Sequence, residues 1–287
     1  MSILRLCPSR RRLVTGSWAV ACIWLAAGCA ATRAAIDLPQ GPGTPYPGHA
    51  EALAEAVGSC RGVRTMEFVL ALRGRSGEAS LRGRVRGAVA RPGSLRLEGL
   101  APFGAPRFVL AADPETAALA LPRARQVVRG AHPREMLYAL AGLPLDPDDL
   151  RAVLTGCVVQ DPSSTAGRAY GSERIAVDLD GGATVYLQPV GGILAVVAGT
   201  RGPLTIAYEG HVRGLPRRVR VLVDGAGGSA GTDLTADLTQ VRVNTPLHPE
   251  AFVLRGQGYT PVTLEELTGR TPLRELSGPA DPRGSTP

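Results

Sequence analysis

The sequence predicts a mainly β protein built around one large antiparallel sheet of about ten or eleven strands. Apolar and polar residues alternate along many segments, so that one face of each strand is apolar and the other is polar. Turns are frequent, because the 287 residues include 36 Gly and 24 Pro. A sheet with one apolar face must cover that face, so we expect it to close on itself or to hold helices in its concavity.

The first 28 residues have the order of a secretory signal. Arginines at 10–12 precede an apolar run, and small residues then lead directly into Cys29. A cysteine in that place resembles the lipobox of bacterial lipoproteins, in which it is lipidated, although Ala26 stands where the motif usually has Leu. The alternative is a membrane-spanning helix, which would need a longer apolar run of ~20 residues. We expect a signal peptide over 1–28, then a lipidated Cys29 and a flexible tether over 29–47.

The net charge is small once the signal is set aside. The formal charge of the chain is +7, of which residues 1–28 contribute +4 through four arginines and no acid, so the remainder carries +3. A nucleic-acid-binding domain usually shows a clustered basic face. We therefore expect no nucleic-acid partner.

The sequence contains no motif typical of a catalytic or metal site. No Gly-x-Ser-x-Gly motif precedes a helix, and the adjacent acids at 148–149 and 265–266 cannot face each other as an acid and a base. The Gly-rich segment 224–232 lacks the Lys and the following helix of a phosphate-binding loop. The histidines are scattered without a second metal ligand at helical spacing; they are His49, His132, His211 and His248. We expect no enzymatic activity, no cofactor and no metal.

Two cysteines, Cys60 and Cys157, remain after the signal and the lipidation site are removed. In an exported protein such a pair suggests a disulfide, here closing a loop of about a hundred residues worth roughly 4 kcal/mol. Two unpaired buried thiols are the alternative, and both readings stay open at this stage.

The folded body is expected over 48–268, followed by a flexible tail over 269–287. Three helices are predicted in the body from apolar spacing and end signals, at 49–59, 133–141 and 147–154. Strands are predicted around the alternating segments 66–72, 81–87, 95–98, 175–179 and 219–223. Asp-Gly-Gly at 180–182 and Val-Gly-Gly at 190–192 predict hairpin turns.

The residues expected to face inward are apolar but small, and both Trp lie in the signal. A wide curved sheet with so little bulk leaves either an apolar void or a shallow two-layer sandwich without a cavity. A void in a lipid-anchored protein would suggest a lipid ligand. The expected cavity-lining residues are Met66, Phe68, Leu70, Leu81, Val85, Leu95, Leu97 and Val109 from strands, and Leu137, Leu140 and Leu150 from helices.

Two segments in the body resemble the LolA/LolB superfamily, and in particular its LolB-like outer-membrane lipoprotein receptors. Residues 95–112 read LRLEGLAPFGAPRFVLAA, and residues 138–156 read YALAGLPLDPDDLRAVLTG. The resemblance covers roughly 49–254 and implies an incomplete β-barrel with lid helices over an apolar cavity that holds acyl chains. It also implies a lipid-anchored protein on the periplasmic side of the outer membrane, acting as a monomer, with a LolA-like periplasmic carrier as a partner.

The resemblance further implies a role for the loop at Pro102, Phe103 and Gly104. LolB-like receptors expose an apolar residue between two early strands, and that residue helps to release cargo into the membrane. Phe103 occupies the matching position, although it could instead fold back onto the barrel rim. The chain departs from the superfamily in its cysteine pair and in having no Trp beyond the signal.

These observations predict a lipid-anchored carrier or receptor. It would accept acyl chains of lipoproteins, or a related lipid, in its cavity and help deliver them to the outer membrane. Ala30, rather than Asp, follows Cys29, which favours the outer over the inner membrane. The alternative is a structural or envelope-assembly lipoprotein that docks a protein partner through its sheet edge and carries no lipid.

Overall fold

The computed structural model describes residues 35–225, 230–254 and 258–270. The chain divides into a unit ending at Ala35 and a second unit that starts at Ile36, and the account below concerns the second. The expected signal peptide and Cys29 lie outside the described residues, as does nearly all of the expected tail.

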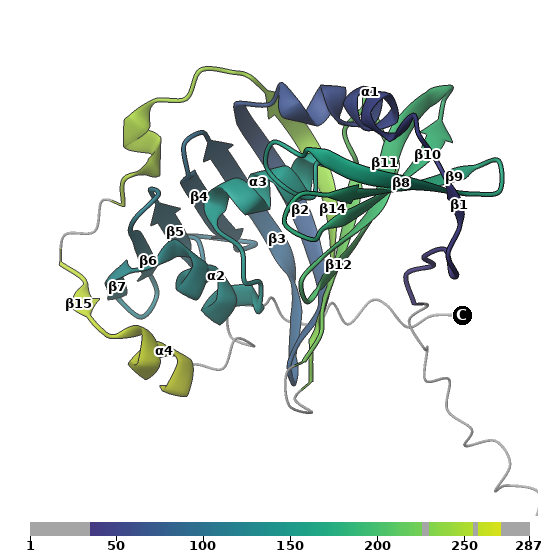
Figure 1. Cartoon of the computed structure of the whole chain (residues 1–287). Coiled ribbons are helices and arrows are strands. Elements are labelled where there is room, and N and C mark those ends of the chain that lie inside the picture. The colour runs from purple at the N-terminus through teal and green to yellow at the C-terminus, as the bar shows by residue number, and fades with distance from the viewer. Residues whose placement is uncertain (1–34, 226–229, 255–257, 271–287) are drawn as a thin grey trace, which may run out of the picture. The chain divides into compact units, whose positions relative to one another are not determined.

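One 15-stranded sheet forms the body (Figure 1), with β1 at one edge and β15 at the other, so it does not close on itself. Neighbouring strands are antiparallel except β15, which runs parallel to β7. In spatial order the strands are β1-β8-β9-β10-β11-β12-β13-β14-β2-β3-β4-β5-β6-β7-β15. Their bounds are β1 Thr44–Pro45, β2 Thr65–Ser76, β3 Ala79–Ala90, β4 Ser94–Leu100, β5 Val109–Ala112, β6 Ala117–Leu121, β7 Gln126–Ala131, β8 Ser164–Tyr170, β9 Arg174–Leu179, β10 Thr184–Val190, β11 Ile193–Arg201, β12 Leu204–Glu209, β13 Arg218–Val223, β14 Thr232–Val243 and β15 Thr260–Pro261.

The helices lie where the sequence places them. They are α1 (His49–Arg61), α2 (Pro133–Ala141), α3 (Pro147–Thr155) and α4 (Leu264–Arg270), with the short 3₁₀ helix η2 (Pro249–Phe252). Both α2 and α3 begin with Pro and end at a glycine in the left-handed region, at Gly142 and Gly156. Figure 1 shows α2 and α3 against the curved sheet beside β3, β4 and β6, while α1 lies across β8–β11.

The strand count exceeds the ten or eleven that were expected, and two kinds of strand account for the difference. β1 and β15 are only two residues long. β5 and β6 are short Ala- and Leu-rich strands in which nearly every residue is buried. Strands buried on both faces lose the alternating pattern, so their apolar runs did not stand out in the sequence.

The convex side of β5–β7 is covered by the C-terminal segment that contains η2 and β15. The guanidinium of Arg96 on β4 donates to the Ala251 carbonyl at 3.1 Å, and the Thr260 amide donates to the Arg125 carbonyl at 2.7 Å. The fold therefore extends past the expected limit of 268, because α4 runs to Arg270.

The folded body also begins earlier than expected. β1 lies inside the segment assigned to the tether, yet it pairs with β8, and the Tyr46 amide donates to the Gly167 carbonyl at 2.9 Å. Two-residue pairings carry little sequence signal, which explains why residues 44–47 were expected to belong to the tether.

The register places one apolar face of the central strands inward. β2 pairs with β3 along its whole length, so that Met66 lies opposite Val89 and Leu70 opposite Val85. β14 pairs with the other side of β2, although it lies more than 150 residues away in the chain. The predicted hairpin turn at 191–192 joins β10 and β11 with both glycines at positive φ, the requirement of the tightest hairpin turns.

Candidate functional site

An apolar cavity of about 530 Å³ lies between the inner face of the sheet and the helix pair α2–α3. Its walls come from β2, β3 and β4, the β4–β5 loop, both helices, the turn between them and one residue of β14. The apolar side chains that line it are Phe68, Leu70, Leu72, Leu81, Val85, Leu97, Leu100, Phe108, Leu137, Leu140, Leu143, Leu150, Leu154 and Leu234.

The cavity has a closed end and an open end. Phe68, Leu150 and Leu154 are among the buried residues of the core and close the inner end. Arg82, Arg84 and Pro102 also belong to the lining but are exposed, so they mark the open end. A ligand can therefore place an apolar body inside and a polar part toward solvent.

Gly83 on β3 leaves part of this space empty. A Cβ atom built on Gly83 would meet no heavy atom within 4 Å, and its backbone is not in the left-handed region. By contrast, Cβ atoms at Gly87 and Gly99 would strike the rings of Phe68 and Phe108 at 2.2 and 2.5 Å. The glycines thus have two roles: two give room to aromatic rings of the wall, and Gly83 gives room to the cavity.

Most of the residues expected to line a cavity do so, and three do not. The eight that line it are Phe68, Leu70, Leu81, Val85, Leu97, Leu137, Leu140 and Leu150. Met66 and Leu95 belong to the buried core, with 1% and 0% exposure, on the part of β2 and β4 nearest the start of α3.

Val109 was expected on the inner face, and this prediction is wrong. It pairs with Glu98, whereas the inward-facing Leu97 pairs with Leu110. Val109 therefore faces the convex side, where it lines a smaller hollow together with Ala251 and Val253 of the C-terminal segment. Burial of β5 on both faces removed the contrast that would have shown which side is inner.

The sequence analysis missed several lining residues that simple extensions of its patterns reach. Leu72 continues the alternation of β2, and Leu154 follows Leu150 by one helical turn. Phe108 and Leu143 lie in loops, where no periodicity applies, and only the tertiary structure brings them to the cavity.

Phe103 lies beside the open end of the cavity with its side chain in solvent. It is 89% exposed, and its neighbour Pro102 contributes to the lining. The structure thus shows the extended arrangement of this loop and not the one in which Phe103 folds back onto the rim. An apolar ring in water gains nothing from that position unless it meets an apolar surface.

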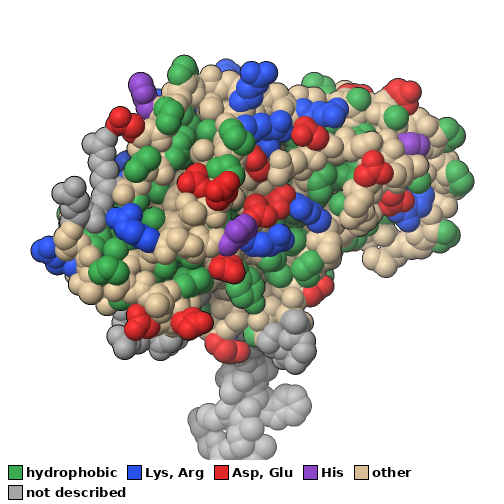
Figure 2. Space-filling model, turned by 60° about the vertical axis from the view of Figure 1, so that its left-hand side comes forward, with side chains coloured by type: hydrophobic (Ala, Val, Ile, Leu, Met, Phe, Trp, Pro, Cys, Tyr) green, Lys and Arg blue, Asp and Glu red, His purple; other side chains and the backbone are tan. Residues whose placement is uncertain are grey.

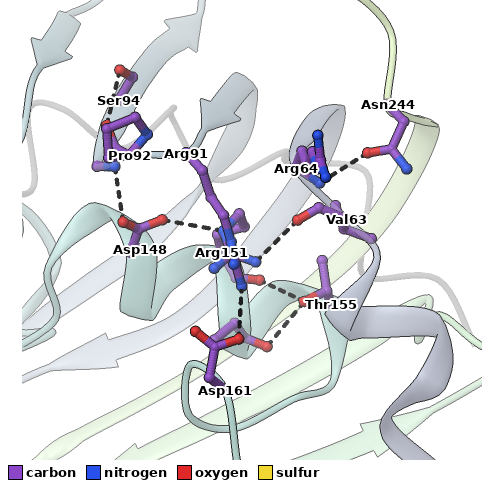
Figure 3. Close-up of polar contacts among 12 residues, drawn as sticks. Val63, Arg64, Arg91, Pro92, Ser94, Asp148, Arg151, Thr155, Asp161 and Asn244 are labelled. Atoms are coloured by element: carbon purple, nitrogen blue, oxygen red, sulfur yellow. Dashed lines mark hydrogen bonds and ion pairs between the residues drawn. The ribbon is translucent and has the colours of Figure 1, made fainter.

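A buried arginine joins α3 to the loop before β2 (Figure 3). Arg151 has a side-chain exposure of 1%; its guanidinium donates to the Val63 carbonyl and to the Asp148 carboxylate, each at 3.2 Å. The other oxygen of Asp148 accepts the Gly93 amide at 2.9 Å. Burial, reinforced by the nearby charge of Arg91, lowers the pKa of Arg151 from its ordinary value.

Two further links hold α3. Asp149, at the start of the helix, accepts from the Arg201 guanidinium of β11 at 2.7 Å. Just past the end of the helix, Cys157 forms a disulfide with Cys60 of α1, with Cα atoms 5.7 Å apart. The structure therefore has the disulfide and not the alternative of two free thiols. These links make α3 a fixed wall of the cavity.

α2 is held differently. Its Arg134 guanidinium donates to the Pro144 carbonyl at 2.7 Å and lies 3.4 Å from Asp146, so both contacts stay within the α2–α3 segment. At its C-terminal end the Gly142 carbonyl accepts from the Thr232 hydroxyl at 3.3 Å. Apolar burial of Met136 and Leu137 holds the rest, which makes α2 the more readily displaced wall.

The other titratable residues of the described chain form no reactive cluster. No group of three or more His, Cys, Asp or Glu residues within the described ranges could hold a metal ion. His211 is half-buried against the Val196 carbonyl, and burial lowers its pKa. Figure 2 shows acidic and basic side chains mixed on one face of the molecule, with hydrophobic side chains between them. No helix among the described residues is both long and apolar enough to span a bilayer.

Comparisons with known proteins give likenesses in structure alone. No protein-family model matches the sequence, and no curated protein matches it. A LolA superfamily protein from Nitrosomonas europaea is similar at 11% identity and a TM-score of 0.46, over 72% of this chain and 98% of that one. A DUF1329 family protein from Desulfovibrio piger is similar at 10% identity and a TM-score of 0.46, over 73% and 98%. The first belongs to the superfamily that the sequence motifs resemble.

Proposed function

We propose that this protein is a lipid-anchored carrier or receptor of the bacterial cell envelope. It accepts acyl chains of lipoproteins, or of a related lipid, in the cavity and helps to deliver them to the outer membrane. The observation that carries the proposal is the apolar cavity between the sheet and α2–α3, open on the side of Phe103.

The size of the cavity suits an acyl chain. If a methylene takes roughly 30 Å³, the share of one water molecule in the liquid, about 530 Å³ holds one chain of common length. Each methylene moved from water into the cavity contributes about 0.8 kcal/mol, so a buried chain would be bound firmly. Delivery then requires the walls to open, and α2 is the wall with fewer polar links to the sheet.

Binding of an apolar fluorescent probe tests the cavity directly. In protein that starts at Ala30, Gly83→Phe would place a ring in the empty space next to Leu81 and Val85 and should reduce probe affinity at least tenfold. Ala71→Phe is the matched control, since Ala71 lies exposed on the adjoining strand β2 outside the lining. Absence of probe binding by the unaltered protein, or equal binding by both variants, would count against the proposal.

The alternative function, docking of a protein partner through a sheet edge, has less support. The strands at the two edges of the sheet, β1 and β15, are each two residues long. Short edge strands offer few backbone groups for pairing with another chain.

A further inference from the structure

Arginine is the only charged residue type in the lining of the cavity. The described residues that line it include Arg82, Arg84 and Arg107 but no Asp, Glu or His. The rest of the lining is apolar apart from backbone groups and glycines. A ligand in this cavity therefore meets hydrocarbon inside and positive charge at the open end.

The position of β3 brings Arg82 and Arg84 to the open end. β3 and β4 stop pairing at Arg84, which lies opposite Leu100, so residues 79–83 have no β4 strand beside them. The side chains of Arg82 and Arg84 start on the convex face. At this free edge no neighbouring strand separates them from the opening, and both are exposed.

These two arginines differ from the others on the same face. Arg73 forms an ion pair with Asp237, Arg75 with Glu78 at 3.7 Å, and Arg86 with Glu98 at 4.0 Å. Within the part of the chain that the structure describes, Arg82 and Arg84 have no hydrogen bond or ion pair. Their charge is thus available to a ligand, whereas that of their neighbours is balanced by carboxylates.

We propose that the cargo is an acyl lipid with an anionic headgroup. The acyl chain lies in the cavity, and the carboxylate or phosphate of the headgroup is bound by Arg82 and Arg84. Guanidinium groups suit both anions, because they donate paired hydrogen bonds in a planar fork. This inference rests on the proposed function and names the class of lipid that the same cavity selects.

Photocrosslinking in a membrane tests the headgroup preference. The full-length protein is placed in phosphatidylcholine nanodiscs that contain one photoactivatable single-chain lipid at equal mole fraction. The three lipids are lysophosphatidylglycerol, palmitic acid and the zwitterionic lysophosphatidylcholine. Crosslinks are counted only on peptides that line the cavity. We expect about tenfold more crosslinking with each anionic lipid than with lysophosphatidylcholine, because hydrogen bonds to charged groups are stronger than neutral ones.

A pair of variants separates the two arginines from general surface charge. Arg82→Gln with Arg84→Gln should remove the preference while leaving crosslinking of the zwitterionic lipid unchanged. Arg86→Gln, on the same strand and face but outside the lining, should keep the preference. Both arginines are exposed, so neither substitution is expected to disturb folding.

The outcomes distinguish failure of this inference from failure of the proposed function. Equal crosslinking of all three lipids, lost on Gly83→Phe, would overturn the headgroup preference and leave the carrier function standing. A preference that survives in the Arg82/Arg84 variant would also overturn it. No crosslink to the cavity from any lipid would overturn the carrier function itself.

Discussion

Single residues decide how this protein presents its cavity to a membrane. Phe103 stands in solvent between Pro102 and Gly104, and Gly104 adopts a φ of 78° that favours glycine. The ring cannot reach the core from this turn, yet it lies beside the opening through which a cargo would pass. Its cost in water and its place at the opening are explained together if the loop meets lipid.

We predict that Phe103→Glu reduces transfer of a bound fluorescent lipid to acceptor vesicles by about tenfold without lowering thermal stability. The ring is 89% exposed, so its removal loses little packing, while a carboxylate resists entry into the bilayer. Transfer is followed by fluorescence dequenching. Ile193→Glu is the matched control, because Ile193 is 62% exposed on the β10–β11 turn and does not line the cavity. A similar loss in both variants would refute a specific role for Phe103.

At the scale of elements, α2 and α3 form one lid segment with unequal attachment. α3 is linked to the β3–β4 turn through Asp148, to the loop before β2 through Arg151 and to β11 through Asp149. The disulfide at Cys157 adds a covalent link just after its end. α2 has the left-handed Gly142 at its end, where a Cβ atom would lie 2.2 Å from the Ser76 hydroxyl. We infer that opening moves α2 about this end while α3 stays with the sheet.

Amide hydrogen exchange should show this inequality. We predict that the amides of α2 exchange faster than those of α3, and that bound lipid slows exchange in α2 most. Replacing Cys60 and Cys157 with Ser should lower global stability by about 4 kcal/mol, since the closed loop spans 97 residues, and should reduce protection in α3. Equal exchange of the two helices in the unaltered protein would contradict the fixed-and-moving assignment.

At the scale of the whole molecule, the function needs both a cavity and a membrane anchor. The anchor is expected at Cys29, outside the described residues. Several acyl chains on one cysteine suffice for stable attachment, because two chains already do. A carrier held at the membrane can transfer cargo with its opening and Phe103 at the lipid surface.

We predict that Cys29→Ser moves the protein from the membrane fraction to the soluble periplasmic fraction and abolishes incorporation of labelled palmitate. The cavity should still bind an apolar probe, because Cys29 precedes the compact unit that begins at Ile36. Membrane fractionation with metabolic labelling checks both results. Continued labelling of the variant would show that lipid is attached elsewhere.

The sequence by itself determined the local features of this protein. Alternating residues identified the central strands, and terminal Pro and Gly residues identified α2 and α3 at their observed positions. Eight of the eleven expected lining residues follow from the same periodicities. These features were predictable because strand alternation, helix periodicity and helix capping depend on residues close together in the chain.

The tertiary structure decided what depends on distant segments. The pairing of β14 with β2, the disulfide between Cys60 and Cys157 and the meeting of Phe108 with Leu143 at the cavity join residues far apart in the chain. The orientation of Val109 was lost for a related reason, since the C-terminal segment buries the outer face of β5. The free edge of β3 likewise exists only because β4 ends earlier, and it is this edge that places Arg82 at the opening. Local patterns specify which face of a strand is apolar, but the packing of remote segments decides whether a cavity forms beneath it and which charges surround its opening.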